Sequence, residues 1–589
     1  MSLRDGRDDA GAGTGDGPRS EAAAERVAAA DTVSPADSLL ADARAWLEQD
    51  PDDATRAELS VLLAEVAAGD PDAVSELAAR FGSRLTFGTA GLRGELGAGP
   101  NRMNRVLVAQ AAAGLAAFLT SREAEPSILI GYDARTNSDV FARDTAELMA
   151  GAGVRAVLLP RALPTPVLAF GVRHLGASAG VMVTASHNPP RDNGYKVYLG
   201  GVDDGAQIVS PTDAEIQSEI LRVAGGDTRD LPRSDGYEVA GDEVVDEYIR
   251  RTAALSPAPT VPLTVVYTAL HGVGWQTARR VFTAAGFGEP IVVAQQIEPD
   301  AAFPTVSFPN PEEPGALDLS FATAAEAGAE LILANDPDAD RLAVAVPDVA
   351  GRWRRLSGNE VGLLLGWRAA ERATAAGPDG AGTLACSLVS SPVLGRIAEA
   401  HGLGFAETLT GFKWISRAPS LRFGFEEALG YLVDPEKVRD KDGISAAVDL
   451  LALAAELKAA GRSVDDRLRE AAERFGAYAS SQVSLRVSDL AEIPRLMTKL
   501  RSAVPDAIGG VPVVRVDDFT DGFDHFPASD LLRFWLDGGS RVILRPSGTE
   551  PKLKAYIDAA STDGTAEERM SAAAATVDAL ERGVRELLA

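Results

Sequence analysis

The chain has one cysteine, Cys386, among its 589 residues. A single cysteine excludes an intramolecular disulfide framework and any zinc or redox site built on a CxxC pair. Long apolar runs are missing too, because none approaches the ~20 residues that a membrane span needs. The first twenty residues, MSLRDGRDDAGAGTGDGPRS, have no apolar core of the kind that a secretory signal carries. These absences predict a cytoplasmic protein that does not enter a membrane.

Positive charge is scarce relative to negative charge. The chain has 57 Lys and Arg against 85 Asp and Glu, which gives a net charge of −28 and a pI near 4.7. Nucleic acids and anionic lipids bind clustered positive charge, so this balance disfavours both as partners. The length predicts about four domains of ~150 residues each.

The pattern along the chain changes three times. A Gly-, Ala-, Asp- and Arg-rich start predicts a disordered tail, and the apolar spacing that follows predicts a helical lead-in. Short β-branched runs then alternate with Ala-rich stretches, which predicts three α/β domains with mixed sheets, before a smaller α+β domain at the C-terminus. The expected units are 1–36 (tail), 37–250 (lead-in and first domain), 251–365, 366–478 and 479–589.

The expected elements are short strands and longer helices. The strand candidates are Ser127–Gly131, Arg155–Leu159, Val181–Thr184, Leu263–Tyr267, Ile291–Ala294, Leu331–Ala334, Leu342–Val346, Ser481–Val487 and Val513–Val516. The helix candidates are Val106–Leu119, Val140–Gly151, Phe321–Gly328, Ile493–Val504 and Ala566–Leu588.

The segment VMVTASHNPPRDNGYKVY, residues 181–198, places polar side chains after a predicted strand. Ser186 and His187 follow the strand at its carboxyl end, where open α/β sheets collect ligands. Ser186 could be a nucleophile or carry a transferred group, and Lys196 could deliver a positive charge or a proton. A lone Ser-His pair is more often an ordinary surface turn. The G-x-S-x-G pattern does not surround Ser186, which disfavours an acyl hydrolase.

The segment ELILANDPDADRLAVAV, residues 330–346, holds three aspartates between two apolar runs. Asp336, Asp338 and Asp340 repel one another unless a cation neutralises them. Oxygen ligands of this kind select Mg²⁺. The loop is not an EF-hand, because Arg341 and Pro347 replace the glycine and glutamate of that motif. A solvated acidic turn is the alternative, and the apolar flanks disfavour it.

The segment RVILRPSGTEPKLKAY, residues 541–556, combines a predicted strand with a basic, hydroxyl-rich turn. Backbone N–H groups, hydroxyls and cations together form an anion cradle. A plain glycine turn with scattered lysines is the alternative, and the Walker A pattern is absent from the sequence. The residues expected to hold the anion are Arg545, Ser547, Gly548, Thr549 and Lys554.

Three further segments, TLTGFKWI (408–415), GFEEALGY (424–431) and RDKDGISAA (439–447), carry a weaker signal. The adjacent Glu426 and Glu427 could accept hydrogen bonds from sugar hydroxyls. Lys413 and Lys441 could meet phosphate or hydroxyl oxygens. Each segment alone is typical of ordinary helix and turn residues.

Taken in this order, the segments resemble the α-D-phosphohexomutase superfamily over nearly the whole chain from about Ser83. The similar motifs are FGTAGLRG (87–94), GYDAR (131–135), TASHNP (184–189), DPDADR (336–341) and RPSGTEPK (545–552). The resemblance implies four domains around one central cleft, three related α/β domains and a smaller fourth. TALHGVG (268–274), TLTGFKWI and GFEEALGY are most similar to the phosphoglucomutase and phosphopentomutase branch.

The resemblance also implies an activity and a set of roles. The chain would interconvert sugar 1-phosphates and 6-phosphates, glucose first, through a phosphoserine at Ser186 and a hexose 1,6-bisphosphate that also serves as primer. Mg²⁺ would be held by Ser186, Asp336, Asp338 and Asp340. The implied catalytic residues are Ser186, His187, Lys196, Arg93 and Lys441, with Lys196 as general base at a lowered pKa. The implied substrate-binding residues are Arg341, Thr410, Gly411, Lys413, Glu426, Arg545, Ser547, Gly548, Thr549 and Lys554.

Other functions stay open from the sequence. Within the superfamily, the alternatives are phosphomannomutase or phosphopentomutase activity. A metal-dependent sugar phosphatase would use the same serine and metal but would need no second phosphate cradle. A non-catalytic sugar-phosphate sensor would need only the pocket. We expect a small phosphosugar as partner and a monomer or homodimer.

Overall fold

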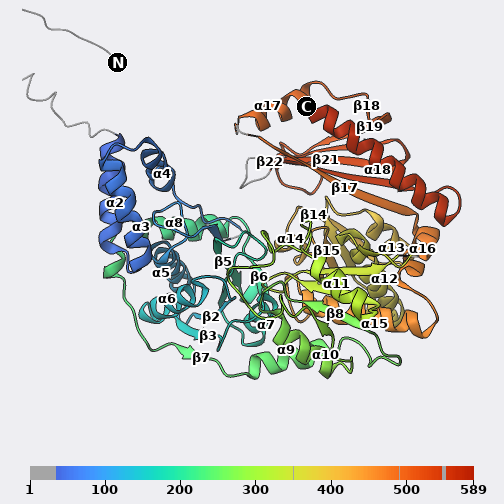
Figure 1. Cartoon of the computed structure of the whole chain (residues 1–589), viewed down its shortest axis with the longest axis horizontal. Helices are drawn as coiled ribbons and strands as arrows, with labels where there is room; N and C mark the ends of the chain where they lie inside the picture. The colour runs from blue at the N-terminus through green and yellow to red at the C-terminus, as the bar shows by residue number, and fades with distance from the viewer. Residues whose placement is uncertain are drawn as a thin grey trace, which may run out of the picture.

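The computed structural model describes residues 35–89, 91–348, 350–487, 489, 491–546 and 552–588. Most of the predicted tail, residues 1–34, lies outside this part, as do Ser547, Gly548 and Thr549 of the predicted phosphate loop. The described residues form four β-sheets, with helices packed on them (Figure 1). No helix in this part of the chain is long and apolar enough to cross a membrane.

The helical lead-in comprises three helices at the blue end of the chain in Figure 1. They are α2 (Pro35–Gln49), α3 (Asp53–Ala67) and α4 (Pro71–Phe81). Asp52 and Asp70 cap α3 and α4 by accepting backbone N–H groups, as N-cap aspartates do. The apolar faces bury Trp46 and Leu59 in a cluster that includes Val106 of the next helix. Burial against the first domain therefore fixes the lead-in.

The first sheet has the strand order β1-β5-β4-β2-β3-β7, with β6 beside β5. Strands β4, β2, β3 and β7 run parallel, whereas β5 pairs antiparallel with both β4 and β1. The strands are β1 (Leu92–Glu95), β2 (Ser127–Tyr132), β3 (Arg155–Leu158), β4 (Ala179–Val183), β5 (Asp192–Leu199), β6 (Ala206–Gln207) and β7 (Glu238–Val239). The α-helices are α5 (Arg105–Arg122), α6 (Ser138–Gly151), α7 (Thr165–His174), α8 (Thr212–Ala224) and α9 (Glu243–Ala253).

The second sheet has the order β12-β11-β10-β8-β9, and the third has the order β14-β13-β15-β16. The second contains β8 (Val265–Thr268), β9 (Ile291–Val292), β10 (Leu331–Asn335), β11 (Leu342–Pro347), β12 (Trp353–Arg355), α10 (Gly274–Ala284) and α11 (Asp318–Ala327). The third contains β13 (Thr383–Ser387), β14 (Gly404–Thr408), β15 (Leu421–Glu426), β16 (Gly430–Leu432), α12 (Gly358–Ala375), α13 (Val393–Ala400), α14 (Phe412–Ile415), α15 (Gly443–Ala459) and α16 (Val464–Phe475).

A common feature of these three sheets positions the site. In each of them, parallel strands are followed by an antiparallel hairpin: β4–β5, β10–β11 and β15–β16. The hairpin turns are residues 184–191, 336–341 and 427–429. The first two turns contain the predicted phosphoserine and metal loops, and the third follows Glu426. Each predicted motif thus occupies a matching place in its own sheet.

The fourth sheet is antiparallel throughout, in the order β17-β22-β21-β20-β19-β18. It contains β17 (Ala477–Arg486), β18 (Ala507–Ile508), β19 (Val511–Asp518), β20 (Leu532–Leu536), β21 (Arg541–Pro546), β22 (Lys552–Ser561), α17 (Glu492–Ser502) and α18 (Ala566–Leu588). Met497 of α17 and Leu580 of α18 bury against the same cluster of strand residues. Gly476, with φ 93°, separates this sheet from α16, where the sequence pattern changes.

The elements expected from the sequence are present, with shifted ends. The largest shifts are at β17, which begins four residues early, at α5, which ends three residues late, and at α11, which begins three residues early. Smaller ones are at β8, which begins at Val265 instead of Leu263, and at β9, which has two residues instead of four. The expected break at residue 366 falls inside α12, whose Gly362 and Gly366 lie against Phe425 and Phe423 of the third sheet. We therefore propose that the third domain begins before Gly358.

Candidate active site

The phosphoserine loop and the metal loop meet, although 150 residues separate Ser186 from Asp336. Ser186 Oγ donates to Asp336 Oδ2 over 2.9 Å and accepts from Arg341 Nη1 over 2.7 Å. Ser186 is 1% exposed and has a left-handed backbone with φ 52°, while its N–H donates to Thr184 Oγ1. The tight turn after β4 therefore aims the hydroxyl at the second sheet.

Arg135 holds this loop from the side of the first sheet. Its guanidinium donates to the carbonyl oxygens of Ser186, Asn188, Pro189 and Asp192 over 2.6–3.0 Å. Arg135 is 3% exposed and lies 3.6 Å from the carboxylate of Asp133. Sequence reasoning matched GYDAR to a motif but assigned Arg135 no role. The available signal was a charged pair directly after a buried strand.

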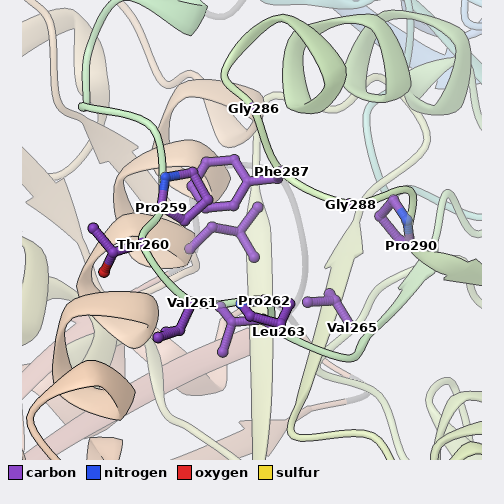
Figure 2. A pocket seen from close by; sticks show the side chains of 11 residues that line it. Pro259, Thr260, Val261, Pro262, Leu263, Val265, Gly286, Phe287, Gly288 and Pro290 are labelled. Atoms are coloured by element: carbon purple, nitrogen blue, oxygen red, sulfur yellow. The ribbon is translucent and has the colours of Figure 1, made fainter.

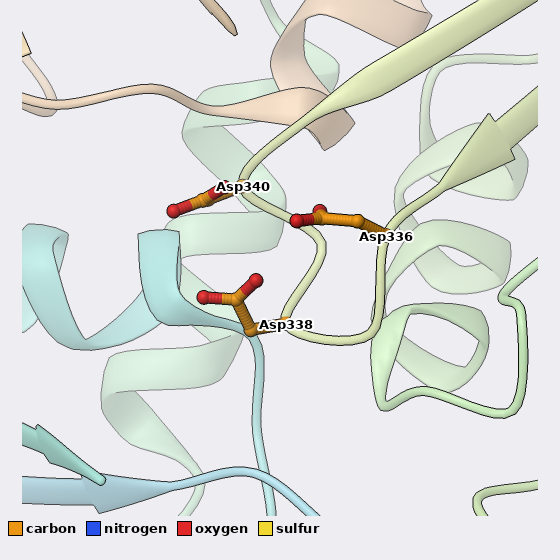
Figure 3. A group of neighbouring side chains, drawn as sticks. All are labelled: Asp336, Asp338 and Asp340. Carbon is orange, nitrogen blue, oxygen red and sulfur yellow. The ribbon is translucent and has the colours of Figure 1, made fainter. Parts of the chain in front are cut away.

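The three aspartates of the metal loop converge (Figure 3). All are fully buried, and one carboxylate oxygen of each lies within 4.8 Å of the others. Among the described residues, Oδ1 of Asp338 and Oδ1 of Asp340 have no hydrogen-bond partner. Burial and the two neighbouring carboxylates raise the pKa of Asp336. Three buried, mutually repelling carboxylates with free oxygens fit a hard divalent cation.

Two lysines contact the same carboxylates. Lys196 Nζ lies 2.8 Å from Asp338 and 2.9 Å from Asp340, and Lys441 Nζ lies 3.3 Å from Asp340. Burial alone would lower the pKa of Lys196, but Asp338 and Asp340 outweigh it, so the pKa is raised. The expected lowering of that pKa is therefore not found. Thr165, which sequence reasoning missed, donates to Asp338 over 2.7 Å.

His187 and Arg93 lie near the residues that surround Ser186. Arg341 Nη1 is 2.9 Å from His187 Nδ1, and Arg93 donates to Asn188 Oδ1 over 3.1 Å. Burial, together with the positive charges of Arg341 and Arg93, lowers the pKa of His187 well below its usual value. The imidazole is consequently neutral near pH 7.

The predicted sugar loops lie beside this centre. Glu426 Oε1 is 3.6 Å from Arg341, and burial raises the pKa of Glu426. Lys413 Nζ donates to Thr89 Oγ1 of the first domain. Thr410 and Gly411 are half-buried in the turn between β14 and α14, where Gly411 has φ 108°. The third domain thus places Glu426 beside Arg341 and Lys413 against the first domain.

The predicted phosphate loop lies on the fourth sheet. Arg545 is the penultimate residue of β21 and is paired in register with Lys554 of β22. Burial and the charge of Arg545 lower the pKa of Lys413, which places a third cation near these two. Burial also lowers the pKa of Lys554, with Lys552 and Arg545 acting in the same direction and Glu427 against them. Arg545 and Lys554 thus form a basic pair on the fourth sheet, and the charge of Arg545 reaches Lys413 of the third domain.

A cavity away from these loops has a different character. Its volume is about 240 Å³, and it is lined by residues 259–263, 265, 286–288, 290 and 451. Figure 2 labels all of these except residue 451. That lining contains no ionisable side chain. This cavity therefore offers no acid, base or charged group for catalysis.

Sequence profiles of the phosphoglucomutase/phosphomannomutase family match the chain in four consecutive parts. The α/β/α domain I matches residues 84–225, domain II residues 246–351, domain III residues 357–475 and the C-terminal domain residues 484–575. The chain belongs to this family. The match confirms the predicted four-domain α/β architecture and the resemblance to the α-D-phosphohexomutases, and it makes the chain a mutase, an intramolecular phosphotransferase.

Individual members of the phosphoglucomutase/phosphomannomutase family cover most of the chain. A "probable phosphomannomutase" of Haemophilus influenzae is 56% identical over 486 residues, which are 82% of this chain and 98% of that protein. The human phosphopentomutase is 35% identical over 570 residues, covering 89% of this chain and 91% of its own length. A phosphoglucomutase/phosphomannomutase family protein of Burkholderia thailandensis has the same fold, with a TM-score of 0.64 at 20% identity, covering 86% of this chain and 98% of that one.

Proposed function

We propose that this family member interconverts sugar 1-phosphates and 6-phosphates, with glucose phosphates as first substrates, through a phosphoryl group carried by Ser186. The observation that supports this most directly is the position of Ser186 Oγ. It lies in hydrogen-bond contact with both Asp336 and Arg341, at a buried point where the turns of two sheets meet.

In the proposed transfer, one O–P bond forms at the sugar oxygen and one breaks at Ser186 Oγ. The free hydroxyl of the sugar phosphate attacks the phosphoryl group, so a sugar O–P bond forms while the bond from phosphorus to Ser186 Oγ breaks. The proton that the sugar hydroxyl loses is matched by the proton that Ser186 regains. The neutral His187 can accept that proton, whereas Lys196 and Lys441, whose pKa values are raised by the neighbouring aspartates, can donate a proton to Ser186. The bisphosphate then turns over in the site and returns its other phosphoryl group to Ser186.

The charges around Ser186 suit this reaction. Arg341, Lys196 and Lys441 place positive charge around the transferred group, and a preorganised positive field stabilises the transition state of phosphoryl transfer. Asp336, Asp338 and Asp340, with the phosphorylated Ser186, would hold Mg²⁺, which when bound supplies Lewis-acid stabilisation of the phosphoryl oxygens. Since Lys196 is held as a cation in this arrangement, its first role is charge neutralisation.

The fourth sheet supplies the anchor for the phosphate that is not transferred. Arg545 and Lys554 are the described members of this anchor, and Ser547, Gly548 and Thr549 complete it in the proposal. Thr410, Gly411, Lys413 and Glu426 would contact the sugar. The relatives named for mannose and pentose phosphates make these sugars the alternative substrates. The proposal also includes a cytoplasmic enzyme that works as a monomer or homodimer.

One assay separates the candidate activities. Glucose 1-phosphate, mannose 1-phosphate and ribose 1-phosphate are each supplied with and without a hexose 1,6-bisphosphate primer, and both the isomerised sugar phosphate and free phosphate are measured. A mutase gives isomerisation that the primer stimulates. Release of free phosphate without isomerisation would instead identify a phosphatase, and binding without turnover would identify a sensor. The Ser186→Ala protein is the matched control.

A further inference from the structure

Lys441 lies between two aspartates, and each of them accepts a hydrogen bond from a buried tyrosine. Tyr198 OH donates to Asp440 Oδ2 over 2.9 Å. Tyr248 OH donates to Asp442 Oδ1 over 2.7 Å. Both tyrosines are fully buried, and the two aspartates are at most 1% exposed. Tyr198 lies on β5 and Tyr248 on α9, so elements outside the third sheet hold the segment that carries Lys441.

Besides the bond from Tyr248, Asp442 has partners in its own domain. It caps α15 by accepting the N–H of Ser445 over 2.9 Å, and it pairs with Lys437 Nζ over 2.9 Å. The carboxylate therefore fixes the start of a helix, as an N-cap aspartate does. Its described partners do not include the ammonium group of Lys441.

Asp440, in contrast, acts on Lys441 directly. Its Oδ1 accepts from the backbone N–H of Lys441 over 2.8 Å and lies 3.3 Å from Lys441 Nζ. Its Oδ2 accepts from Tyr198 and, over 2.7 Å, from Gln207 Nε2 of β6. One oxygen of Asp440 therefore faces the first domain, and the other holds the lysine.

The same strand also carries the second cation of the site. Lys196 and Tyr198 are two residues apart on β5, so their side chains lie on one face of the strand. Lys196 Nζ contacts Asp340 Oδ2 over 2.9 Å, and Lys441 Nζ reaches that oxygen over 3.3 Å. Strand β5 thus places one ammonium group directly and the other through Tyr198 and Asp440.

We propose that Tyr198 and Asp440 are positioning residues that hold the ammonium group of Lys441 against Asp340, at a fixed distance from Lys196. The inference rests on the proposed function, because it assigns these residues to the transfer step at Ser186. A carboxylate that accepts two hydrogen bonds on one oxygen, here one from a fully buried phenol and one from a half-buried amide, keeps its other oxygen in a fixed place. Without the phenol, Asp440 can turn, and Lys441 follows it.

The test compares Tyr198→Phe with Tyr248→Phe. Each variant removes one phenolic oxygen that donates to an aspartate next to Lys441, and both positions are fully buried. We expect similar losses of thermal stability from the two. We expect kcat of Tyr198→Phe to fall about ten-fold with KM nearly unchanged, because Tyr198 positions Lys441 at the reacting end of the site and does not touch the phosphate anchor. Tyr248→Phe should keep kcat within about two-fold of the wild type.

A second variant and a structural measurement complete the design. Gln207→Met removes the other hydrogen bond to Asp440 Oδ2 and should lower kcat in the same direction, by less, even if Tyr198→Phe folds poorly. Crystal structures of the variants should show Lys441 Nζ displaced from Asp340 in Tyr198→Phe and unmoved in Tyr248→Phe. Equal kcat losses in the two tyrosine variants, or a Lys441 that stays in place in Tyr198→Phe, would overturn the proposal. If the wild type isomerises no sugar phosphate, the proposed function fails, and the crystal structures still decide the positioning of Lys441.

Discussion

The two ends of the proposed substrate site belong to parts of the molecule that are attached in different ways. The first three sheets share one buried cluster, which runs from Leu129 of β2 through Tyr267 of β8 to Phe423 of β15. The fourth sheet has its own core and joins the third domain through a smaller cluster that includes Leu388 and Phe519. The reacting groups thus lie on sheets that share a core, and the anchor lies on a separately packed unit.

Polar contacts follow the same division. At the reacting end, Ser186, Asp336 and Arg341 contact one another directly, so each depends on the others. At the anchoring end, Glu407 of β14 accepts from Arg533 and from Arg541 of the fourth sheet, both over 2.9 Å. Transfer of a phosphoryl group needs atoms fixed within a fraction of an ångström, whereas an anchor needs correct charge. We therefore expect substitutions at the reacting end to lower activity more than substitutions at the anchoring end.

The largest effect is expected at the serine. Ser186→Ala removes the atom that carries the phosphoryl group, so turnover should fall at least ~10³-fold while the protein stays folded. Steady-state assays measure the loss, and mass spectrometry of the wild type should find phosphate on the peptide 181–191. Activity near the wild-type level in folded Ser186→Ala would contradict the role of the serine.

The metal comes second. Removal of divalent cations leaves three buried carboxylates balanced only by their neighbouring cations, and it removes several kcal/mol of proposed charge stabilisation, so activity should fall more than about a hundred-fold. Chelation followed by dialysis measures the fall, and added Mg²⁺ should restore activity. Asp338→Asn should weaken Mg²⁺ binding in calorimetry. Full activity in protein shown to be free of metal would exclude the site.

The anchor comes third. Arg545→Ala should lose one charge-assisted contact, about 1.5–3 kcal/mol, which is about ten- to a hundred-fold in kcat/KM for both the 1-phosphate and the 6-phosphate. Hydrolysis of the Ser186 phosphate by water needs no anchor and should be spared. Arg515→Ala is the matched control, because Arg515 is an exposed arginine of the same domain paired with Asp517. If Arg545→Ala lowered isomerisation and hydrolysis by the same factor, Arg545 would not be a phosphate anchor.

What the sequence could predict was local. Apolar periodicity and the punctuation by glycine and proline locate the strands, and the turns that follow them contain Ser186 and the three aspartates. Each motif is a short run of residues, so its chemistry can be read without the fold. The first three sheets carry matching hairpins, and this explains why these short motifs come together at one site.

What the sequence could not predict depends on distant partners. Lys196 was expected at a lowered pKa from nearby cations, but it meets Asp338, which lies 142 residues away, and the sign reverses. The bonds of Arg135 to the phosphoserine loop and of Tyr198 to Asp440 likewise join segments that only the packed sheets bring together. The spacing of residues along the sequence does not predict such contacts.

The smallest effect is expected where the fourth sheet joins the third domain. Glu407→Gln removes the negative charge that Arg533 and Arg541 share, while each arginine keeps another carboxylate, Asp517 and Asp558 respectively. The remaining pairs limit the cost, so we expect KM for both sugar phosphates to rise about three-fold, which is less than 1 kcal/mol, with kcat unchanged. The exposed pair of Glu399 with Arg396 provides the control, since Glu399→Gln should change neither constant. If Glu407→Gln lowered kcat and left KM unchanged, attachment of the fourth sheet would govern the transfer step itself, and the two ends of the site would not be separable.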